Sequence, residues 1–257
     1  MGDCGIAVAL RLTGIDQRSV HVFYVRKDDG QMHDDAKERR NDADDGRAGR
    51  QDGPGDERTR DDERQTVKEI ISMDVKDAVL KRRALRSFEN TKIDQTVIDR
   101  LIESASLSAS CFNNQPWRYV FVNDDAVLKK LHEALPKGNV WATVAPLIIV
   151  VCSKKENDCL IKGREYFLFD CGLSVSQLIL TATELGLVAH PIAGYDEEMT
   201  KTTLGIPQDM TVITLIIAGV HSQTISPLLS EKQIKDEKER PARLPKEQIV
   251  FFNIFPT

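Results

Sequence analysis

The sequence predicts an α+β fold for the chain from about residue 73 onward. Apolar residues at helical spacing, as in residues 94–105, alternate along the chain with uninterrupted β-branched runs, as in 147–152 and 212–219. The first pattern is typical of helices that bury one face, and the second is typical of strands buried on both faces. The mixture indicates the fold class, although the order and direction of the strands do not follow from it.

The chain divides by composition near residue 72. Residues 1–72 carry 13 Lys and Arg and 17 Asp and Glu, and charged side chains occupy 23 of the 38 positions in 27–64. Such a segment has too little apolar surface to offset its ordering entropy, so we expect residues 1–72 to be a disordered charged extension. Residues 73–257 are long enough to form one buried core. We also consider the hypothesis that translation starts at Met73, in which case the extension would not belong to the native protein.

Five helices are expected in residues 73–257. Acidic residues that can cap a helix precede three of them, and Gly186 and Gly205 stand where two of them end. The predicted helices cover residues 75–83, 94–105, 125–135, 170–187 and 196–204.

Strands and loops fill the intervals between these helices. The segments 118–122, 147–152 and 212–219 read as strands, and the apolar run at 249–252 is strand-like. Two loops are rich in turn-forming or small polar residues, one at 108–116 and a tight one at 190–196.

Composition excludes several classes of function. The formal net charge is −5 without a basic stripe, which argues against nucleic-acid binding. The longest apolar runs, about nine residues, are shorter than the ~20 that a membrane span needs, and the N-terminal residues do not resemble a signal peptide. Five cysteines without CxxC spacing suggest neither a disulfide framework nor a zinc site, and no histidine motif indicates a metal or a catalytic triad. We expect a cytoplasmic protein.

Arginines are the first candidate binding residues. Arg82, Arg83 and Arg86 lie within five positions, and such a group is stable when it is solvated or shares an anion. Arginine suits bidentate recognition of phosphate. A phosphate site and a solvated basic face both remain open from this pattern, and Arg243 could add a contact.

The loop Ser110–Trp117 is the second candidate, because short polar side chains allow a bound group to approach closely before a core strand begins. An ordinary loop capped by a structural Trp is the alternative. Trp141 could stack in a substrate pocket or lie in the core, and His190 could donate a proton or simply be packed.

Four separated motifs together resemble those of the FMN-dependent nitroreductases over about residues 75–255. Each motif alone is weak, but all four occur in the family's order and spacing. They are RRALRSF at residues 82–88, SCFNNQPW at 110–117, PIAGYD at 191–196 and RLPKEQIV at 243–250.

The resemblance implies a three-layer α-β-α sandwich with a mostly antiparallel central sheet, built as an intertwined homodimer with FMN at the subunit interface. The cofactor-binding residues that it implies fall into three groups. Phosphate and ribityl contacts would come from Arg82, Arg83, Arg86 and Arg243, with Ala84 near the ring edge; the partner subunit would supply Ser110, Cys111 and Asn113; and Pro191, Ile192, Ala193 and Gly194 would line the flavin.

Three positions depart from the family pattern. Ala84 stands where many members have Ser, and Cys111 and Phe112 replace smaller or more polar residues. We interpret Cys111 as a small apolar filler, with a redox-active thiol as the alternative. Phe112 and Trp141 are the weak candidates for a substrate pocket.

The implied activity is ping-pong transfer of hydride from NADH or NADPH, through flavin N5, to an electrophilic acceptor of the nitroaromatic or quinone type. No protein side chain is expected to be catalytic. Two alternatives remain. One is a specialised relative, such as a reductive dehalogenase or a flavin-fragmenting enzyme, and the other is a flavin-binding or sensing protein without turnover.

Overall fold

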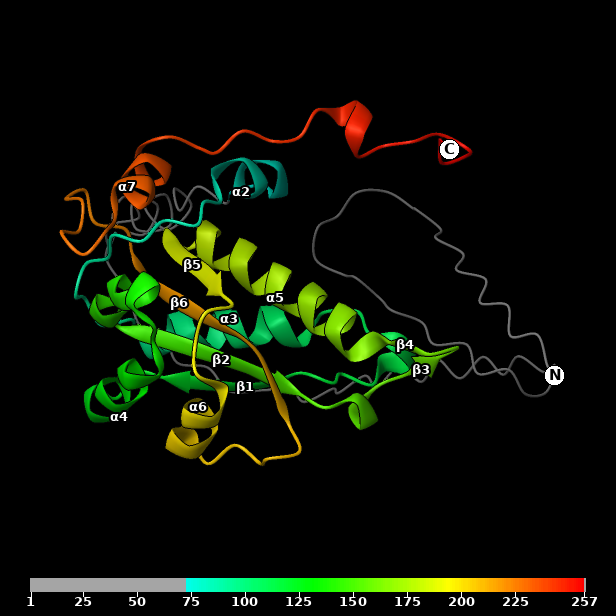
Figure 1. Ribbon diagram of the computed structural model, residues 1–257, viewed down its shortest axis with the longest axis horizontal. Helices are drawn as coiled ribbons and strands as arrows, with labels where there is room; N and C mark the ends of the chain where they lie inside the picture. Colours follow the sequence, from blue (N-terminus) through cyan, green and yellow to red (C-terminus); the bar gives the residue numbers. More distant parts are fainter. Residues whose placement is uncertain (1–72, 257) are drawn as a thin grey trace, which may run out of the picture. The chain divides into compact units, whose positions relative to one another are not determined.

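The centre of the fold is a four-stranded antiparallel sheet. The computed structural model describes residues 73–256. The predicted extension at 1–72 lies outside the described residues, and the hypothesis of a translation start at Met73 stays a prediction. The strands follow the order β1-β2-β6-β5 across the sheet, and all three pairings are antiparallel, as predicted (Figure 1). Their bounds are Arg118–Val122 for β1, Leu147–Ser153 for β2, Leu187–Ile192 for β5 and Thr211–Val220 for β6.

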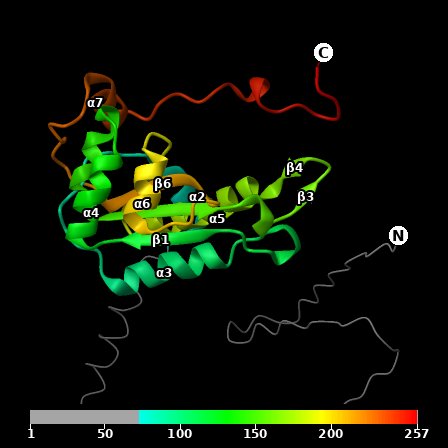
Figure 2. The same cartoon turned by 60° about the horizontal axis from the view of Figure 1, so that its bottom comes forward.

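Strand β2 is buried on both faces, which explains its uninterrupted apolar sequence. Leu147, Ile149 and Val151 pack with residues of helices α3 (Gln95–Ser106) and α5 (Tyr166–Glu184). Ile148 and Val150 point to the opposite core, which includes residues of α4 (Asp125–Leu131). Figure 2 shows α3 below the sheet and α4 and α6 (Glu197–Leu204) above it. The predicted three-layer α-β-α arrangement is therefore confirmed.

Two helices begin at the acidic caps that the sequence predicts. The Asp124 carboxylate accepts the N–H groups of Ala126 and Val127, both at 3.0 Å, at the start of α4. The Asp196 carboxylate accepts the N–H of Met199 at 2.8 Å at the start of α6. These bonds satisfy donors that a helix leaves free at its first turn.

Smaller elements complete the described chain. A two-stranded hairpin leads directly into α5, and a charged helix precedes the C-terminal tail. The remaining bounds are Val75–Lys81 for α2, Leu160–Ile161 for β3, Arg164–Glu165 for β4 and Glu231–Lys238 for α7, with 3₁₀ turns at Cys111–Asn113 (η1), His132–Ala134 (η2), Lys137–Val144 (η3), Lys155–Asn157 (η4) and Lys246–Gln248 (η5).

The loop predicted at 190–196 is partly wrong, because its first three residues end strand β5. Pro191 obscured this strand, since proline cannot donate to a ladder. Strand β5 lies at the edge of the sheet, where a missing donor is tolerated.

Several further boundaries differ from the prediction. Helix α2 ends at Lys81 and not at residue 83. Helix α5 begins at Tyr166, four residues before the expected start, because the hairpin leads straight into it, and it ends at Glu184, since Leu187 already begins β5. The segment 249–252 is not a strand in the described chain; it follows η5 in a tail whose apolar side chains are exposed. A strand needs a partner with which to pair, and none reaches this tail within the described chain.

Helix α5 has the length and apolar composition of a membrane span, with a mean hydropathy of 1.2, and it is the one such helix in the described residues. A helix that covers a sheet can meet the same criteria. One face of α5 is buried in this way, through Phe167, Cys171 and Leu178, whereas Leu168 and Phe169 are exposed. The hydropathy of α5 is thus explained in part by the fold, because some of its apolar side chains cover the sheet and others are exposed.

Candidate functional site

Five arginines from two distant parts of the chain line one pocket of about 290 Å³. Arg82, Arg83 and Arg86 follow the end of α2, whereas Arg240 and Arg243 follow the end of α7. Ala84 also lines the pocket. The structure therefore brings together the predicted phosphate group, and Arg240 is a member that the sequence analysis missed although it lies only three residues before Arg243.

Backbone carbonyls hold two of these arginines. One nitrogen of Arg83, Nη2, donates to the carbonyls of Asp236 at 2.7 Å and Glu237 at 3.1 Å. Arg240 Nη2 donates to the carbonyls of Leu80 at 2.6 Å and Arg82 at 2.9 Å. The end of α7 and the end of α2 are joined through these bonds, which set the shape of the pocket.

The pocket carries an excess of positive charge, because Asp236 is the one acidic residue among the residues that line it. Among the described residues, none of the ion pairs involves an arginine of this group. The pKa of Arg82 is lowered from its ordinary value by burial, and then by the charges of Arg240, Arg243 and Arg83. Like charges held this closely favour a bound anion, and guanidinium groups suit phosphate.

A buried carboxylate positions the Arg86 segment. Glu237, only 7% exposed, accepts the N–H groups of Arg86 at 2.9 Å and Ser87 at 3.0 Å, and it pairs with His221 Nε2 at 3.1 Å. Burial alone would raise the pKa of Glu237, but these donors outweigh it and lower the pKa below its usual value. Sequence analysis missed this residue, because it sits in a run of charged residues that resembles a solvated helix face.

The arginine segment is connected to β5 through a buried histidine. His190 Nδ1 lies 3.0 Å from the carbonyl of Leu85, and burial is the main reason why the pKa of His190 falls to about 4. The imidazole is therefore neutral at pH 7. Of the two interpretations of His190, the packed residue is the one that its burial supports.

Trp141 lies in the core. Its ring is 1% exposed and stands 4.8 Å from the His190 ring and 6.1 Å from the Phe88 ring, centroid to centroid. The Arg86 guanidinium lies 5.8 Å from its centroid, which is cation–π distance. The suggestion that Trp141 stacks on a substrate is corrected, because a ring covered on all sides cannot contact one.

The turn after β5 contains four predicted flavin-lining residues. Pro191 and Ala193 are exposed, Gly194 is half-buried and Ile192 is buried. A Cβ on Gly194 would come within 2.9 Å of the amide nitrogen of Asn139, which donates to the Gly194 carbonyl at 2.8 Å. In this position, the Asn139 side chain therefore leaves room only for a glycine at position 194, whether or not a flavin is bound. The sequence analysis did not identify Asn139 as a neighbour of this turn.

The loop Ser110–Trp117 lies apart from the arginine pocket, and Ser110, Cys111 and Asn113 do not line that pocket. The loop is linked to the segment that precedes the β3–β4 hairpin, at the end of the molecule opposite α7 in Figure 1. Within one chain the structure therefore separates the two groups, which is compatible with a contribution from a partner subunit and does not test it.

The backbone of this loop is unusual. Phe112, Asn113 and Gln115 all have positive φ, between 48° and 57°, a region that costs side chains other than glycine about 1 kcal/mol or more. Phe112 is 87% exposed, so no packing of its ring explains its conformation. The loop needs other contacts to hold it.

A disulfide between Cys111 and Cys159 supplies one of these contacts. This pairing corrects the inference that the cysteine spacing suggests no disulfide, and with it the interpretation of Cys111 as an apolar filler. The β1–β2 register pairs Arg118 with Cys152, and Cys111 and Cys159 lie seven residues beyond that pair on either side. Antiparallel strands keep such positions at the same end of a sheet, so the register was the signal that could have revealed the bond.

Comparison with known proteins agrees with the geometry. A protein from Methanothermobacter thermautotrophicus, provisionally named NADH dehydrogenase/NAD(P)H nitroreductase, is 28% identical over 155 residues, which are 58% of this chain and 78% of that protein. A crystal structure of a nitroreductase family protein from Clostridium novyi NT is 26% identical, with a TM-score of 0.56, and the match covers 59% of this chain and 87% of that one.

A third protein, from Exiguobacterium sibiricum, was crystallised in complex with FMN. It is 20% identical with a TM-score of 0.59, and the match covers 70% of this chain and 97% of that one, a likeness that concerns the fold alone. The nitroreductase family profile matches residues 79–219 of this chain. Because that match spans more than half of the sequence, the protein belongs to the nitroreductase family.

Proposed function

We propose that this protein is an FMN-dependent oxidoreductase that takes hydride from NADH or NADPH and passes it, through flavin N5, to an electrophilic acceptor of the nitroaromatic or quinone type. The observation that carries the proposal is a pocket lined by five arginines, none of which forms an ion pair among the described residues, in a chain of the nitroreductase family. Bound FMN would supply the hydride chemistry, and the protein would supply orientation and electrostatics.

The arginine pocket fits the phosphate of FMN in charge and in donor geometry. Arg82, Arg86 and Arg243 make no hydrogen bond to a carboxylate in the described chain, so their guanidinium donors are available. Arg83 and Arg240 are anchored by carbonyls and present a preformed wall. A dianion would relieve the repulsion among these arginines, which after burial is the second reason why the pKa of Arg82 is lowered.

The turn after β5 fits a role beside the flavin ring. No hydrogen bond within the described residues uses the N–H of Ala193 or Gly194. Both donors remain available to a planar acceptor, and the small size of Ala193 and Gly194 themselves allows it to approach. The buried link from His190 to Leu85 holds this strand against the arginine segment.

No protein acid or base is required for this chemistry. His190 is neutral and covered, so it fits a structural role better than proton donation. Donor and acceptor would occupy the same site in turn, which predicts ping-pong kinetics. Parallel double-reciprocal plots are expected, and intersecting plots would contradict the proposed order.

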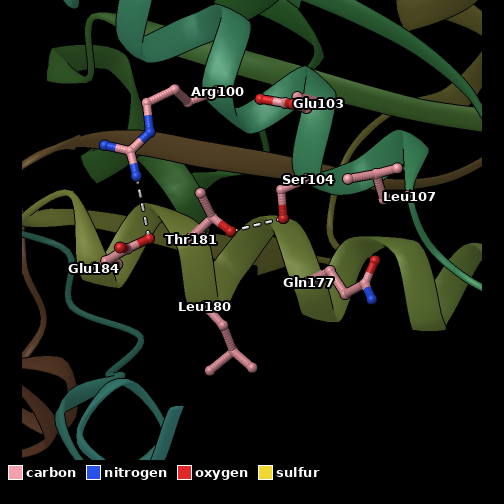
Figure 3. A pocket seen from close by; sticks show the side chains of 8 residues that line it. All are labelled: Arg100, Glu103, Ser104, Leu107, Gln177, Leu180, Thr181 and Glu184. Carbon is pink, nitrogen blue, oxygen red and sulfur yellow. Dashed lines mark hydrogen bonds and ion pairs between the residues drawn. The ribbon is translucent and has the colours of Figure 1, made fainter. Parts of the chain in front are cut away.

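We further propose a homodimer that completes the site. Figure 3 shows the open groove between α3 and α5, where Arg100 pairs with Glu184 and Ser104 bonds Thr181 across the two helices. This groove, of about 390 Å³, lies on the outer side of the same helix pair that covers the sheet. Leu180 extends away from α3 in this view.

Exposed apolar side chains suggest what covers this face. Phe169 on α5 is 61% exposed, and Phe252 and Phe255 in the tail are more exposed still. An apolar helix face and an apolar tail of one chain fit the corresponding parts of a second copy, as in an isologous dimer. Such a dimer would let Ser110, Cys111 and Asn113 reach the FMN of the partner.

Reconstitution tests the proposal directly. The purified protein mixed with excess FMN and then desalted is expected to retain one FMN for each chain, and light scattering is expected to give a dimer. Retention of no flavin, or a flavin-loaded monomer, would overturn the assignment. Rapid-mixing reduction of the bound flavin by NADH or NADPH distinguishes the enzyme from a flavin-binding protein without turnover.

The compartment that we propose is the cytoplasm, which supplies NADH and NADPH. Disulfides of cytoplasmic proteins are usually transient or redox-sensing. The Cys111–Cys159 bond therefore raises a question that the proposed activity alone does not answer.

A further inference from the structure

The Cys111–Cys159 disulfide is the main link between the loop at 110–115 and the rest of the chain. One strong hydrogen bond also reaches the loop from the body: the Cys111 N–H donates to the buried Asp170 carboxylate at 2.6 Å. Beyond Cys111, the side chain of Asn114 contacts Asp158 at 3.2 Å and Cys159 Sγ at 3.3 Å, in an exposed setting. The sulfur bridge thus ties down a segment that has few other anchors.

Strand β1 supplies one more anchor, because Arg118 Nη1 donates to the Gln115 carbonyl at 3.0 Å, and the loop's other bonds are local. The Gln115 N–H donates to Ser110 Oγ at 3.0 Å, and the Gln115 side chain donates to the Asn113 carbonyl at 3.1 Å. Bonds within a loop move with it and do not anchor it to the body. After residue 115 the chain is well held, because Trp117 is buried and the Pro116 carbonyl accepts Ser153 Oγ at 2.8 Å.

The backbone conformation of the loop is unfavourable, so we expect the loop to change conformation once the disulfide is broken. Three residues with positive φ stand within residues 112–115, and two of them, Phe112 and Gln115, are of types that rarely adopt this conformation. Backbone of this kind persists only where the surroundings impose it. The disulfide joins the loop where this stretch begins.

Both cysteines are half-buried, so a small thiol can reach the bond from solvent. Cys152 and Cys171, by contrast, are free and buried in the described structure. The partly accessible pair is therefore the one suited to exchange.

We propose that Cys111 and Cys159 form a reversible thiol–disulfide site whose oxidation holds residues 110–115 in place and whose reduction releases them. Because this loop is expected to reach the FMN of the partner subunit, the consequence for the cofactor rests on the proposed function. The oxidised protein would bind FMN more tightly than the reduced protein.

The chemistry balances with glutathione as the reductant. Two glutathione thiols supply two electrons and two protons; the S–S bond between the cysteines breaks, each cysteine becomes a thiol, and one glutathione disulfide forms. The reverse reaction uses glutathione disulfide and releases two glutathione thiols. No metal or further cofactor is needed.

A metal site is the competing interpretation of the same side chains. Cys111, Asp158 and Cys159 lie close enough together to share an ion. A structural zinc site needs four ligands, and the nearby Asp170 carboxylate already accepts the Cys111 N–H. Since the structure joins the two sulfur atoms to each other, the disulfide is the interpretation that we adopt.

The first measurement asks whether the bond exists and controls the loop. Protein without FMN is equilibrated with reduced glutathione or with its disulfide, and each sample is digested without further reduction. A cross-linked peptide pair containing Cys111 and Cys159 is expected only after oxidation. Hydrogen exchange of residues 110–115 is expected to be faster in the reduced sample, with exchange in β2 unchanged.

The second measurement asks whether the bond affects the cofactor. FMN affinity is expected to be at least about fivefold weaker in the reduced protein, the lower end of ordinary coupling between two sites. The variant Cys159→Ser should show the weaker affinity in both conditions and no response to glutathione. Cys4→Ser, which leaves the pair intact, should respond like the wild type.

Several results would overturn the proposal: absence of the cross-linked pair after oxidation, equal hydrogen exchange in the two samples, equal FMN affinity in them, or zinc retained at one ion per reduced chain. Failure to bind FMN in either state would contradict the proposed function, whereas hydrogen exchange would still decide whether the disulfide holds the loop.

Discussion

The two candidate binding regions are built in opposite ways. We call the pocket of five arginines the arginine end and the segment 110–115 the loop end. At the arginine end, residues separated by more than 150 positions meet within one chain and are held by Glu237 and by carbonyls of α2 and α7. At the loop end, Ser110 to Asn113 belong to one short segment, lie partly exposed and are held chiefly by one disulfide. The first region forms a pocket within a single chain, and the second does not line that pocket.

This difference indicates which part of cofactor binding each end would perform. A self-contained pocket with fixed charges can bind an anion before any partner arrives. Backbone strain clusters at ligand-binding and switch segments, so the exposed loop is the region that we propose for contact with a partner chain. Variants that affect one end and not the other can test this division.

The largest effect is expected at the arginine end. Arg82→Ala removes a charged donor from the pocket and should weaken FMN binding by about 1.5–3 kcal/mol, or roughly 10- to 150-fold. Equilibrium titration of flavin fluorescence measures the change. Lys81→Ala, which removes an exposed charge beside the pocket, is the matched control and should bind FMN like the wild type.

Mixing two variants would decide whether the loop acts across the dimer. In a heterodimer of Arg82→Ala and Asn113→Ala chains, one site carries both defects and the other carries neither if the partner supplies Asn113. One tight site for each heterodimer is then expected. Two weakened sites would mean that both residues serve the FMN of their own chain.

The second prediction concerns pH and the link between the two elements at the arginine end. The pKa of His190 is about 4 in the folded chain, below its ordinary value of 6.5, so between these values the unfolded chain binds more protons. Stability should therefore fall as pH decreases from 6.5, by about 2 kcal/mol at pH 5. Urea unfolding at pH 7 and pH 5 measures it, and His190→Gln should flatten the difference.

A somewhat smaller effect is expected from Glu237→Gln. The amide would keep one acceptor but place a donor near the N–H groups of Arg86 or Ser87, at a cost of about 1–2 kcal/mol in the free energy of unfolding. Glu239→Gln, an exposed neighbour on the same segment, should change nothing. Equal stability of the two variants would remove Glu237 from its positioning role.

The smallest effect is predicted at the turn after β5. Gly194→Ala would place a methyl group against the Asn139 amide and disturb its bond to the Gly194 carbonyl, costing about 1 kcal/mol. Gly138→Ala meets nothing within 4 Å and should be tolerated. Thermal unfolding of both variants gives the comparison, and an unaffected Gly194→Ala would show that Asn139 adapts freely.

The sequence predicts the parts of this fold that depend on local pattern. Strands β2 and β6 are found because each is a nearly continuous apolar run, and α4 and α6 because an aspartate precedes each. Strand β5 is missed in part, since Pro191 looks like a loop residue until the strand is known to be at an edge. Its position in the sheet is a property of the whole fold.

The candidate site follows the same rule. The arginines of 82–86 and Arg243 can be identified from motifs, whereas Glu237 cannot, because its burial depends on the backbone of Arg86 and on His221. The disulfide needs the β1–β2 register before its two cysteines appear as neighbours. Residues that act through long-range contacts carry little local signal.

The chain contains two tryptophans, and one lies at each of the contrasted ends. Trp141 packs between Phe88 and His190 with the Arg86 guanidinium over its ring, whereas Trp117 is buried just after the disulfide-held loop. Indole emission depends on neighbouring charge and solvent. Replacing either ring by phenylalanine leaves a single tryptophan, so with selective excitation of that indole the occupation of the arginine pocket and the release of the loop could be followed separately, in real time and without an attached dye.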